Sequence, residues 1–130
     1  MKKTTDLHTF SNGKYTYNVK TLWKLAPKTQ WIKTTTLKTK NLYQPVWGNN
    51  HPTPAQLLKT KTEPHWTTTL KADLRFAIIL APDLSLMDGY HRLTKALYLK
   101  KPKIKARLFT HYDQLAPALI TPDKKCHHPD

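Results

Sequence analysis

The sequence contains little cysteine and no long apolar run. Cys126 is the single cysteine among 130 residues, so no internal disulfide can form, and this fits a reducing compartment. No stretch of about 18 apolar residues is present, which argues against a membrane-spanning helix. The basic first residues, MKKTTDLHTF, lack the apolar segment of a signal peptide. We therefore expect a cytoplasmic protein without a membrane partner.

Acidic residues are scarce as well. The chain has 8 Asp+Glu against 22 Lys+Arg, which gives a formal net charge of +14. Only Arg75, Arg92 and Arg107 are arginines, so few side chains can make the two-point phosphate contacts of a guanidinium. The excess of lysine is typical of proteins that contact nucleic acid, and equally of proteins that use lysine for solubility. Both interpretations stay open.

The length of the chain suits one compact domain. Residues 1–16 are polar and contain the turn signal Asn12-Gly13, so we expect a flexible N-terminal arm. The domain itself is predicted over residues 17–112. Residues 113–130, which include three prolines, are expected to form a partly disordered tail.

The first half of the domain predicts short elements. Spaced apolar residues indicate a helix over 19–25, and a strand is expected at 30–34. Thr53 followed by Pro54 is typical of a helix N-cap and its first residue. A further helix is expected over 64–72.

The second half predicts a strand, a second strand, a helix and a third strand. FAIILA at 76–81 is a continuous apolar run, which indicates a strand buried on both faces. A short strand at 84–88 precedes a helix over 90–100. Residues 103–109 alternate basic and apolar residues, as in a half-buried strand. The predicted fold class is therefore α+β, with a small mixed sheet flanked by helices.

The residues Asp88-Gly89-Tyr90-His91-Arg92 stand where the second strand leads into the helix. A helix N-terminus attracts anions, Gly89 permits close approach of the backbone, and Arg92 can bind two phosphate oxygens. His91 can exchange a proton near neutral pH, and Asp88 can cap the helix, orient His91 or hold a metal ion. Tyr90 is expected to be a packing or rim residue and not a nucleophile. The structural alternative is a capped helix start with an Asp–Arg pair.

The sequence AIILAPDLSLMDGYHRLTKALYLKKPKIKARLF, residues 77–109, resembles the ParB/sulfiredoxin-like family through DGYHRLTKA at 88–96. In that family the corresponding region holds the triphosphate of CTP, reduces a sulfinic acid through a cysteine, or phosphorylates free serine. Tyr90 stands where the reductase has its cysteine, so reductase activity is not expected. A partitioning role is not expected either, since no helix-turn-helix domain follows.

The resemblance implies a nucleotide- or phosphate-binding site formed by Gly89, Tyr90, His91 and Arg92, with Asp88 and His91 as catalytic candidates. It also implies a nucleoside triphosphate or diphosphate with Mg²⁺ as ligand, and phosphoryl transfer as an option. The serine kinases add a carboxylate from elsewhere in the chain. Glu63 and Asp73 are both candidates for it, and the choice stays open, as does whether the protein is an enzyme.

The alternative function is a non-enzymatic DNA- or RNA-binding accessory protein. Its basic strip would consist of Lys100, Lys101, Lys103, Lys105 and Arg107. Against this, lysines that alternate along a strand also prevent pairing at a sheet edge.

Two further patterns are given structural interpretations. The tryptophans at 23, 31, 47 and 66 can stack on bases but are expected to fill the core. KKCHH at 124–128 cannot complete a tetrahedral metal site by itself, so no metal site is predicted. The sequence does not indicate an oligomeric state.

Overall fold

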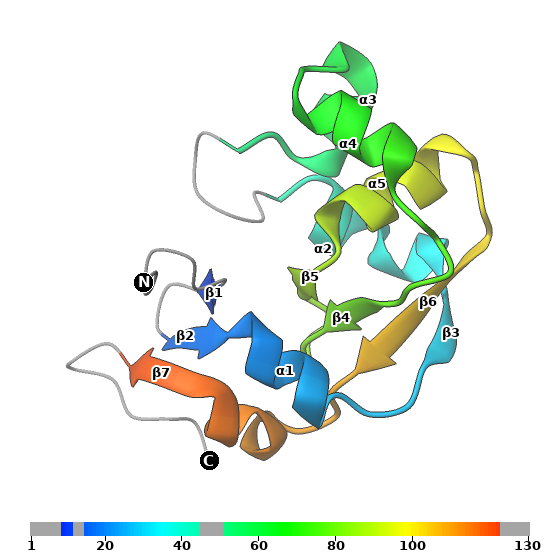
Figure 1. Cartoon of the computed structure of the whole chain (residues 1–130). Coiled ribbons are helices and arrows are strands. Elements are labelled where there is room, and N and C mark those ends of the chain that lie inside the picture. Colours follow the sequence, from blue (N-terminus) through cyan, green and yellow to red (C-terminus); the bar gives the residue numbers. More distant parts are fainter. Residues whose placement is uncertain (1–8, 12–14, 45–50, 123–130) are drawn as a thin grey trace.

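The computed structural model describes residues 9–11, 15–44 and 51–122, and it has an α+β fold with two small sheets and short helices (Figure 1). This confirms the predicted α+β class. No helix within these ranges is long and apolar enough to cross a membrane. The elements in chain order are β1 (Thr9–Ser11), β2 (Tyr15–Asn18), α1 (Val19–Leu25), β3 (Gln30–Lys33), the 3₁₀ helix η2 (Thr34–Leu37), α2 (Lys38–Leu42), α3 (Pro54–Thr60), α4 (His65–Lys71), β4 (Ile78–Leu80), β5 (Leu86–Asp88), α5 (Tyr90–Tyr98), β6 (Lys103–Leu108), the 3₁₀ helix η3 (Tyr112–Ala118) and β7 (Leu119–Pro122).

The larger sheet is mixed and has the strand order β3-β6-β4-β5. Strands β4 and β6 are parallel. The chain reverses from β4 to β5, and after helix α5 it enters β6 at the end of the sheet where β4 also begins. Strands β3 and β5 are antiparallel to their neighbours. Strand β6 is therefore an interior strand, with a partner on each side.

Strand β4 is buried on both faces, as the apolar run predicts. Ile78 and Leu80 belong to one core cluster, which also contains residues of α3, α4 and α5. Ile79 belongs to a second cluster with residues of α1, β2 and η3. All three side chains are fully buried. The larger sheet thus separates two cores, with α3–α5 on one face and α1, β2 and η3 on the other (Figure 1).

The second sheet joins parts of the expected arm and tail to the predicted domain. Its antiparallel strands β1, β2 and β7 come from the expected arm, the start of the domain and the expected tail. Phe10 and Tyr15 are buried, and so are Leu115 and Ala118 of η3. These side chains cover the second face of β4, so the described parts of the arm and tail are part of the fold.

Local sequence signals place the short helices as expected. Helix α1 begins after Asn18, whose side chain accepts a hydrogen bond from the backbone of Thr21. Helix α3 has the predicted cap at Thr53 and Pro54 in its first turn. The backbone of Gln56 donates a hydrogen bond to Thr53 Oγ1, and the side chain of Gln56 accepts one from the backbone of Thr53. Helices α4 and α5 pack against each other and form the wall behind the candidate site.

Candidate functional site

One pocket, named here the motif pocket, contains every residue of the predicted motif. Its volume is about 510 Å³. It lies at the start of α5 and is closed on one side by the end of α4 and the connection to β4. Its lining residues are Thr68, Lys71, Ala72, Asp73, Phe76, Asp88, Gly89, Tyr90, His91 and Arg92.

Gly89 is the N-cap of α5 and has a φ of +107°, a backbone conformation that residues with a side chain rarely adopt. A Cβ atom at this position would lie 2.5 Å from Cγ2 of Ile78. The glycine therefore lets β5 turn sharply into α5 directly against β4. Because Gly89 has no side chain to cap the helix, the start of α5 faces the pocket without a side-chain cap.

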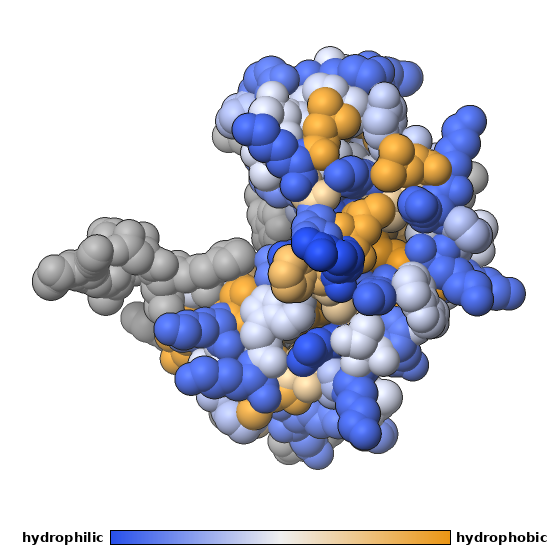
Figure 2. Space-filling model, turned by 45° about the vertical axis from the view of Figure 1, so that its right-hand side comes forward, coloured by the Kyte–Doolittle hydropathy of each residue, from blue (hydrophilic) through white to orange (hydrophobic). Residues whose placement is uncertain are grey.

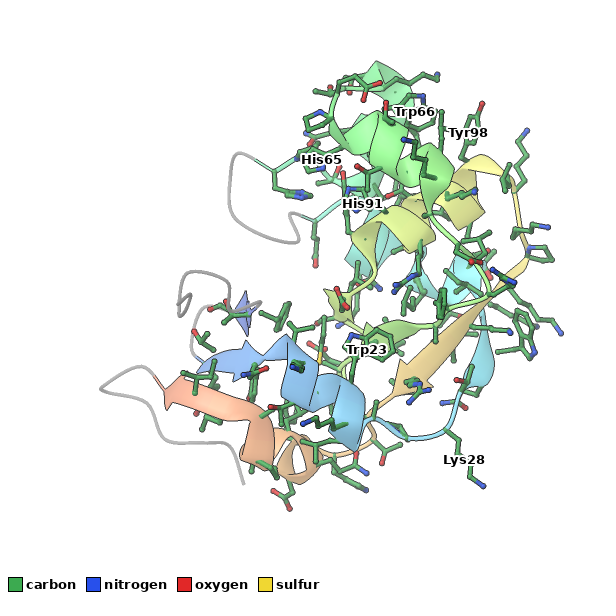
Figure 3. The ribbon with its side chains drawn as sticks, viewed as in Figure 1. Trp23, Lys28, His65, Trp66, His91 and Tyr98 are labelled. Atoms are coloured by element: carbon green, nitrogen blue, oxygen red, sulfur yellow. The ribbon has the colours of Figure 1, made fainter. Side chains whose placement is uncertain are left out.

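Asp88 is held by a tryptophan from the other side of the sheet. The indole Nε1 of Trp23 donates a hydrogen bond of 2.7 Å to Asp88 Oδ2. Figure 3 shows Trp23 on α1 directed toward β4 and β5. The Arg107 guanidinium carbon lies 5.6 Å from the centre of the Trp23 ring, so this ring is also in contact with a cation.

Arg92 has a structural contact as well as a place in the pocket. Its Nη1 donates a hydrogen bond of 3.0 Å to the carbonyl of Ala77, just before β4. Its guanidinium carbon lies 5.9 Å from the centre of the Trp23 ring and 5.7 Å from that of Phe76. The bond to Ala77 uses one of five N–H donors, so the fork still has donors to offer a ligand oxygen.

Three histidines and a tyrosine pack together beside the pocket. His65 Nδ1 and His91 Nε2 are 3.1 Å apart and share a hydrogen bond (Figure 3). The His51 ring lies 4.6 Å from that of His65 and 4.4 Å from that of Tyr90. Burial raises the pKa of Tyr90 to about 12, and its side chain is almost completely buried, so of the two expected roles Tyr90 has the packing one.

The surroundings of His91 favour its neutral form. Burial, followed by the nearby charges of His65, His51 and Arg92, lowers the pKa of His91 from 6.5 to about 4. The pKa of His65 is also lowered, first by burial and then by the nearby charge of His51. His91 is therefore neutral at pH 7 and can accept or donate one hydrogen bond without a charge.

A pH titration of stability tests this arrangement. Because the folded pKa of His91 is below the unfolded value of about 6.5, the folded state binds fewer protons, and its stability falls as the pH drops from about 6.5 to about 4. Urea denaturation at several pH values should show this loss. In His91→Asn the loss over the same window should be smaller, and an identical pH profile in the variant would contradict the assignment.

The structure distinguishes the two candidate carboxylates, Asp73 and Glu63, by their distance from the motif pocket. Asp73 lines the motif pocket, whereas Glu63 is exposed and accepts a hydrogen bond from the backbone of Thr67 in α4. Arg75 binds both oxygens of Asp73, at 2.7 to 3.1 Å. Hydrogen bonds from Arg75 lower the pKa of Asp73 to about 2. Asp73 is therefore the acid near the motif, but Arg75 already occupies its carboxylate.

Four residues around the motif were not predicted from the sequence. Thr68, Lys71 and Phe76 line the pocket, and Trp23 holds Asp88 from behind. Thr68 and Lys71 lie on the same helix, three residues apart, and therefore share one face of α4. No local pattern connects Trp23 with Asp88, because 65 residues separate them.

The predicted basic strip is divided by the structure. Lys101 and Lys105 line a second concave surface, whereas Arg107 packs against Trp23. Lys100 and Lys103 are exposed outside both sites.

The four tryptophans do not share one environment. Trp66 is buried as predicted, but Trp31 is 60% exposed, which contradicts its assignment to the core. Trp47 and the residues at 124–128 lie outside the described residues. Within the described ranges, no three His, Cys, Asp or Glu side chains are arranged to hold a metal ion.

Comparison with family models, with curated proteins and with solved structures gives no match for this chain. The resemblance of residues 77–109 to the ParB/sulfiredoxin-like family therefore remains a prediction.

Proposed function

We propose that the protein is a ParB/sulfiredoxin-like domain that binds a nucleotide, or a similar phosphate-bearing ligand, in the motif pocket. The observation that carries the proposal is that the five consecutive residues 88–92 all line one cavity. Its volume of about 510 Å³ lies within the range of small-molecule sites, roughly 300–1,000 Å³.

The phosphate groups would lie at the start of α5. There the partial positive charge of the helix and the guanidinium of Arg92 act on the same anion. Lys71 adds a second cation from the opposite wall. Gly89 contributes the sharp turn that brings the start of α5 to the pocket, since the position of its missing Cβ is directed at Ile78 and not at a ligand.

The base would lie against Phe76. This side chain lines the pocket and is 59% exposed, so one face of an apolar ring is available. Stacking on an aromatic ring tolerates any base, because every base has a π-face. The pocket therefore fits a nucleotide better than inorganic phosphate, although it does not select one base.

The pocket also fits a Mg²⁺ ion that arrives with the nucleotide. Mg²⁺ is usually bound by one or two carboxylates together with substrate phosphates, and Asp88 is the suitable carboxylate. Asp73 fits less well, because Arg75 binds both of its oxygens. When bound, the ion would neutralise phosphate charge.

The environment of His91 favours ligand binding over proton transfer. A group with a pKa of about 4 is a weak base at neutral pH, whereas general-base catalysis works best with a pKa near the working pH. Neutral His91 would therefore hold a ligand hydroxyl or phosphate by a hydrogen bond. Phosphoryl transfer would need a further base or a ligand that raises the pKa of His91.

A thermal-shift screen of nucleoside mono-, di- and triphosphates, with and without Mg²⁺, tests the proposal. A ligand at 100 times its Kd should stabilise the fold by about 2.7 kcal/mol. Lys71→Gln should reduce the shift, and Lys59→Gln, an exposed lysine on α3, should leave it unchanged. If no nucleotide raises the unfolding temperature, the proposal is wrong.

A further inference from the structure

A second concave surface, named here the β3–β6 groove, lies beside the motif pocket. It has a volume of about 750 Å³ and forms where the connection between α4 and β4 passes the end of α5 and the exposed face of β3 and β6. Figure 2 turns the right-hand side of Figure 1 toward the reader. On this face, hydrophilic side chains surround separate apolar ones. The groove is lined by Trp31, Lys71, Ala72, Asp73, Leu74, Arg75, Lys95, Leu99, Lys101 and Lys105.

The charge of the groove is almost entirely positive. Five of its residues are cationic, namely Lys71, Arg75, Lys95, Lys101 and Lys105. Its single acid, Asp73, already forms an ion pair with Arg75 at 2.7 Å. Lys95 donates hydrogen bonds to the carbonyls of Leu70 and Ala72 and also lies near Asp73. The groove still has four more cations than it has acids, so the surface suits a ligand with several negative charges.

Trp31 supplies an aromatic surface in the same groove. It lies directly opposite Lys105 in the pairing of β3 with β6, and the Lys105 ammonium is 5.7 Å from the centre of its ring. Its side chain is 60% exposed. A tryptophan that is open to solvent and next to a lysine has the elements for stacking a base beside a phosphate.

The lysines of β6 do not protect a sheet edge. Strand β6 pairs with β3 on one side and with β4 on the other, so its backbone is fully engaged. The structural explanation considered for Lys103 and Lys105 therefore does not apply. Ligand binding and solubility are the explanations that remain for these lysines, and the exposed ring of Trp31 beside Lys105 favours ligand binding.

We propose that the β3–β6 groove binds single-stranded nucleic acid, with phosphates on its cations and one base stacked on Trp31. A single strand fits better than a duplex, because the bases of a duplex are stacked on each other and are not available to stack on Trp31. A single strand also fits better than an acidic peptide, because only the strand offers regularly spaced anions together with flat rings. The groove contains no side-chain set that would distinguish ribose from deoxyribose.

The groove and the motif pocket share a wall. Lys71, Ala72 and Asp73 line both. A strand in the groove can therefore reach toward the pocket, but the proposal stands without a ligand there. The two sites are distinguished by testing mononucleotides and oligonucleotides separately.

Fluorescence anisotropy with labelled oligonucleotides of about 15 nucleotides tests the proposal. Poly-dT and poly-rU strands should bind more tightly than a duplex of equal length, and comparison of the two strands shows whether DNA or RNA is preferred. Trp31→Ala should weaken strand binding about tenfold, a typical loss for one stacked base. Tyr43→Ala, which removes another exposed aromatic ring outside the groove, should have no effect.

A pair of charge variants tests the cations of the groove. Lys101→Gln/Lys105→Gln removes two charges from the groove, and Lys24→Gln/Lys59→Gln removes two exposed charges elsewhere. The plot of log affinity against log salt should become flatter by about 1.4 in the groove variant, because each single-strand phosphate contact contributes about 0.7. The control variant should keep the slope.

Two outcomes would overturn the proposal. In the first, duplex and single strand bind equally and Trp31→Ala has no effect. In the second, the slope of log affinity against log salt becomes flatter by the same amount in both charge variants. This would mean that the whole basic surface binds nucleic acid without a defined groove. Mononucleotide thermal shifts that persist in Trp31→Ala would show that the motif pocket is intact whichever result is obtained.

Discussion

Gly89→Ala is expected to destabilise the protein by about 2–5 kcal/mol, which is a large fraction of the stability of a domain of this size. Two effects add. The φ of +107° is costly for any residue with a Cβ, and the new methyl group would lie 2.5 Å from Cγ2 and 2.9 Å from Cβ of Ile78. Ile78 is fully buried in strand β4 and cannot move aside. Urea denaturation of the variant measures the loss.

A double-mutant cycle with Ile78→Ala separates the two effects. Ile78→Ala removes Cγ2 and with it the closest contact, so Gly89→Ala should cost less in that background. The cost that remains belongs to the backbone conformation and to the contact with Cβ of residue 78, which alanine retains at 2.9 Å. If Gly89→Ala costs the same in both backgrounds, the contact with Cγ2 of Ile78 is not a cause.

Arg92→Ala should cost about 2–3 kcal/mol of stability even without a ligand. The variant loses a charged hydrogen bond to the Ala77 carbonyl and contacts with two aromatic rings. Arg92→Lys keeps the charge but loses the planar fork, so it should recover part of the stability and little of any two-point phosphate contact. From the sequence alone, Arg92→Lys would be expected to change stability very little. The bond to Ala77 revises that expectation.

Measurements of stability and ligand affinity on the same variants separate the two roles of Arg92. If Arg92 only supports the fold, Arg92→Lys loses stability and the wild-type protein shows no nucleotide shift. If it also contacts phosphate, Arg92→Lys should reduce the nucleotide-induced rise in unfolding temperature by more than its loss of stability explains. Lys71→Gln provides the comparison, because Lys71 is exposed and lines the pocket from α4.

Local sequence patterns predicted the elements around the motif well. The apolar run at 76–81, the cap at Thr53 and the alternation at 103–109 each depend on neighbouring residues. The motif at 88–92 was expected where a strand leads into a helix, and its residues do line one pocket. These features are predictable because a few adjacent side chains determine them.

The features that the sequence did not reveal depend on distant contacts. The run at 76–81 requires cover on both faces, yet nothing local shows that the cover for Ile79 comes from both ends of the described chain. Phe10, Tyr15 and Leu115 are isolated apolar residues in polar stretches, and their burial follows only from the second sheet. The exposure of Trp31 is of the same kind, since it depends on which face of the larger sheet remains uncovered.

The second sheet has a consequence for the order of folding. Tyr17 pairs with Leu119, 102 residues further along the chain, whereas β4, β5 and α5 lie within a few residues of each other. Closing a long loop costs entropy before its contacts form, so the core around Ile79 should form after the core around Ile78. Trp23 lies against the first of these cores, and its indole holds Asp88. The start of α5 can therefore exist before the pocket is complete, and the pocket reaches its final form only when the two ends of the described chain have met.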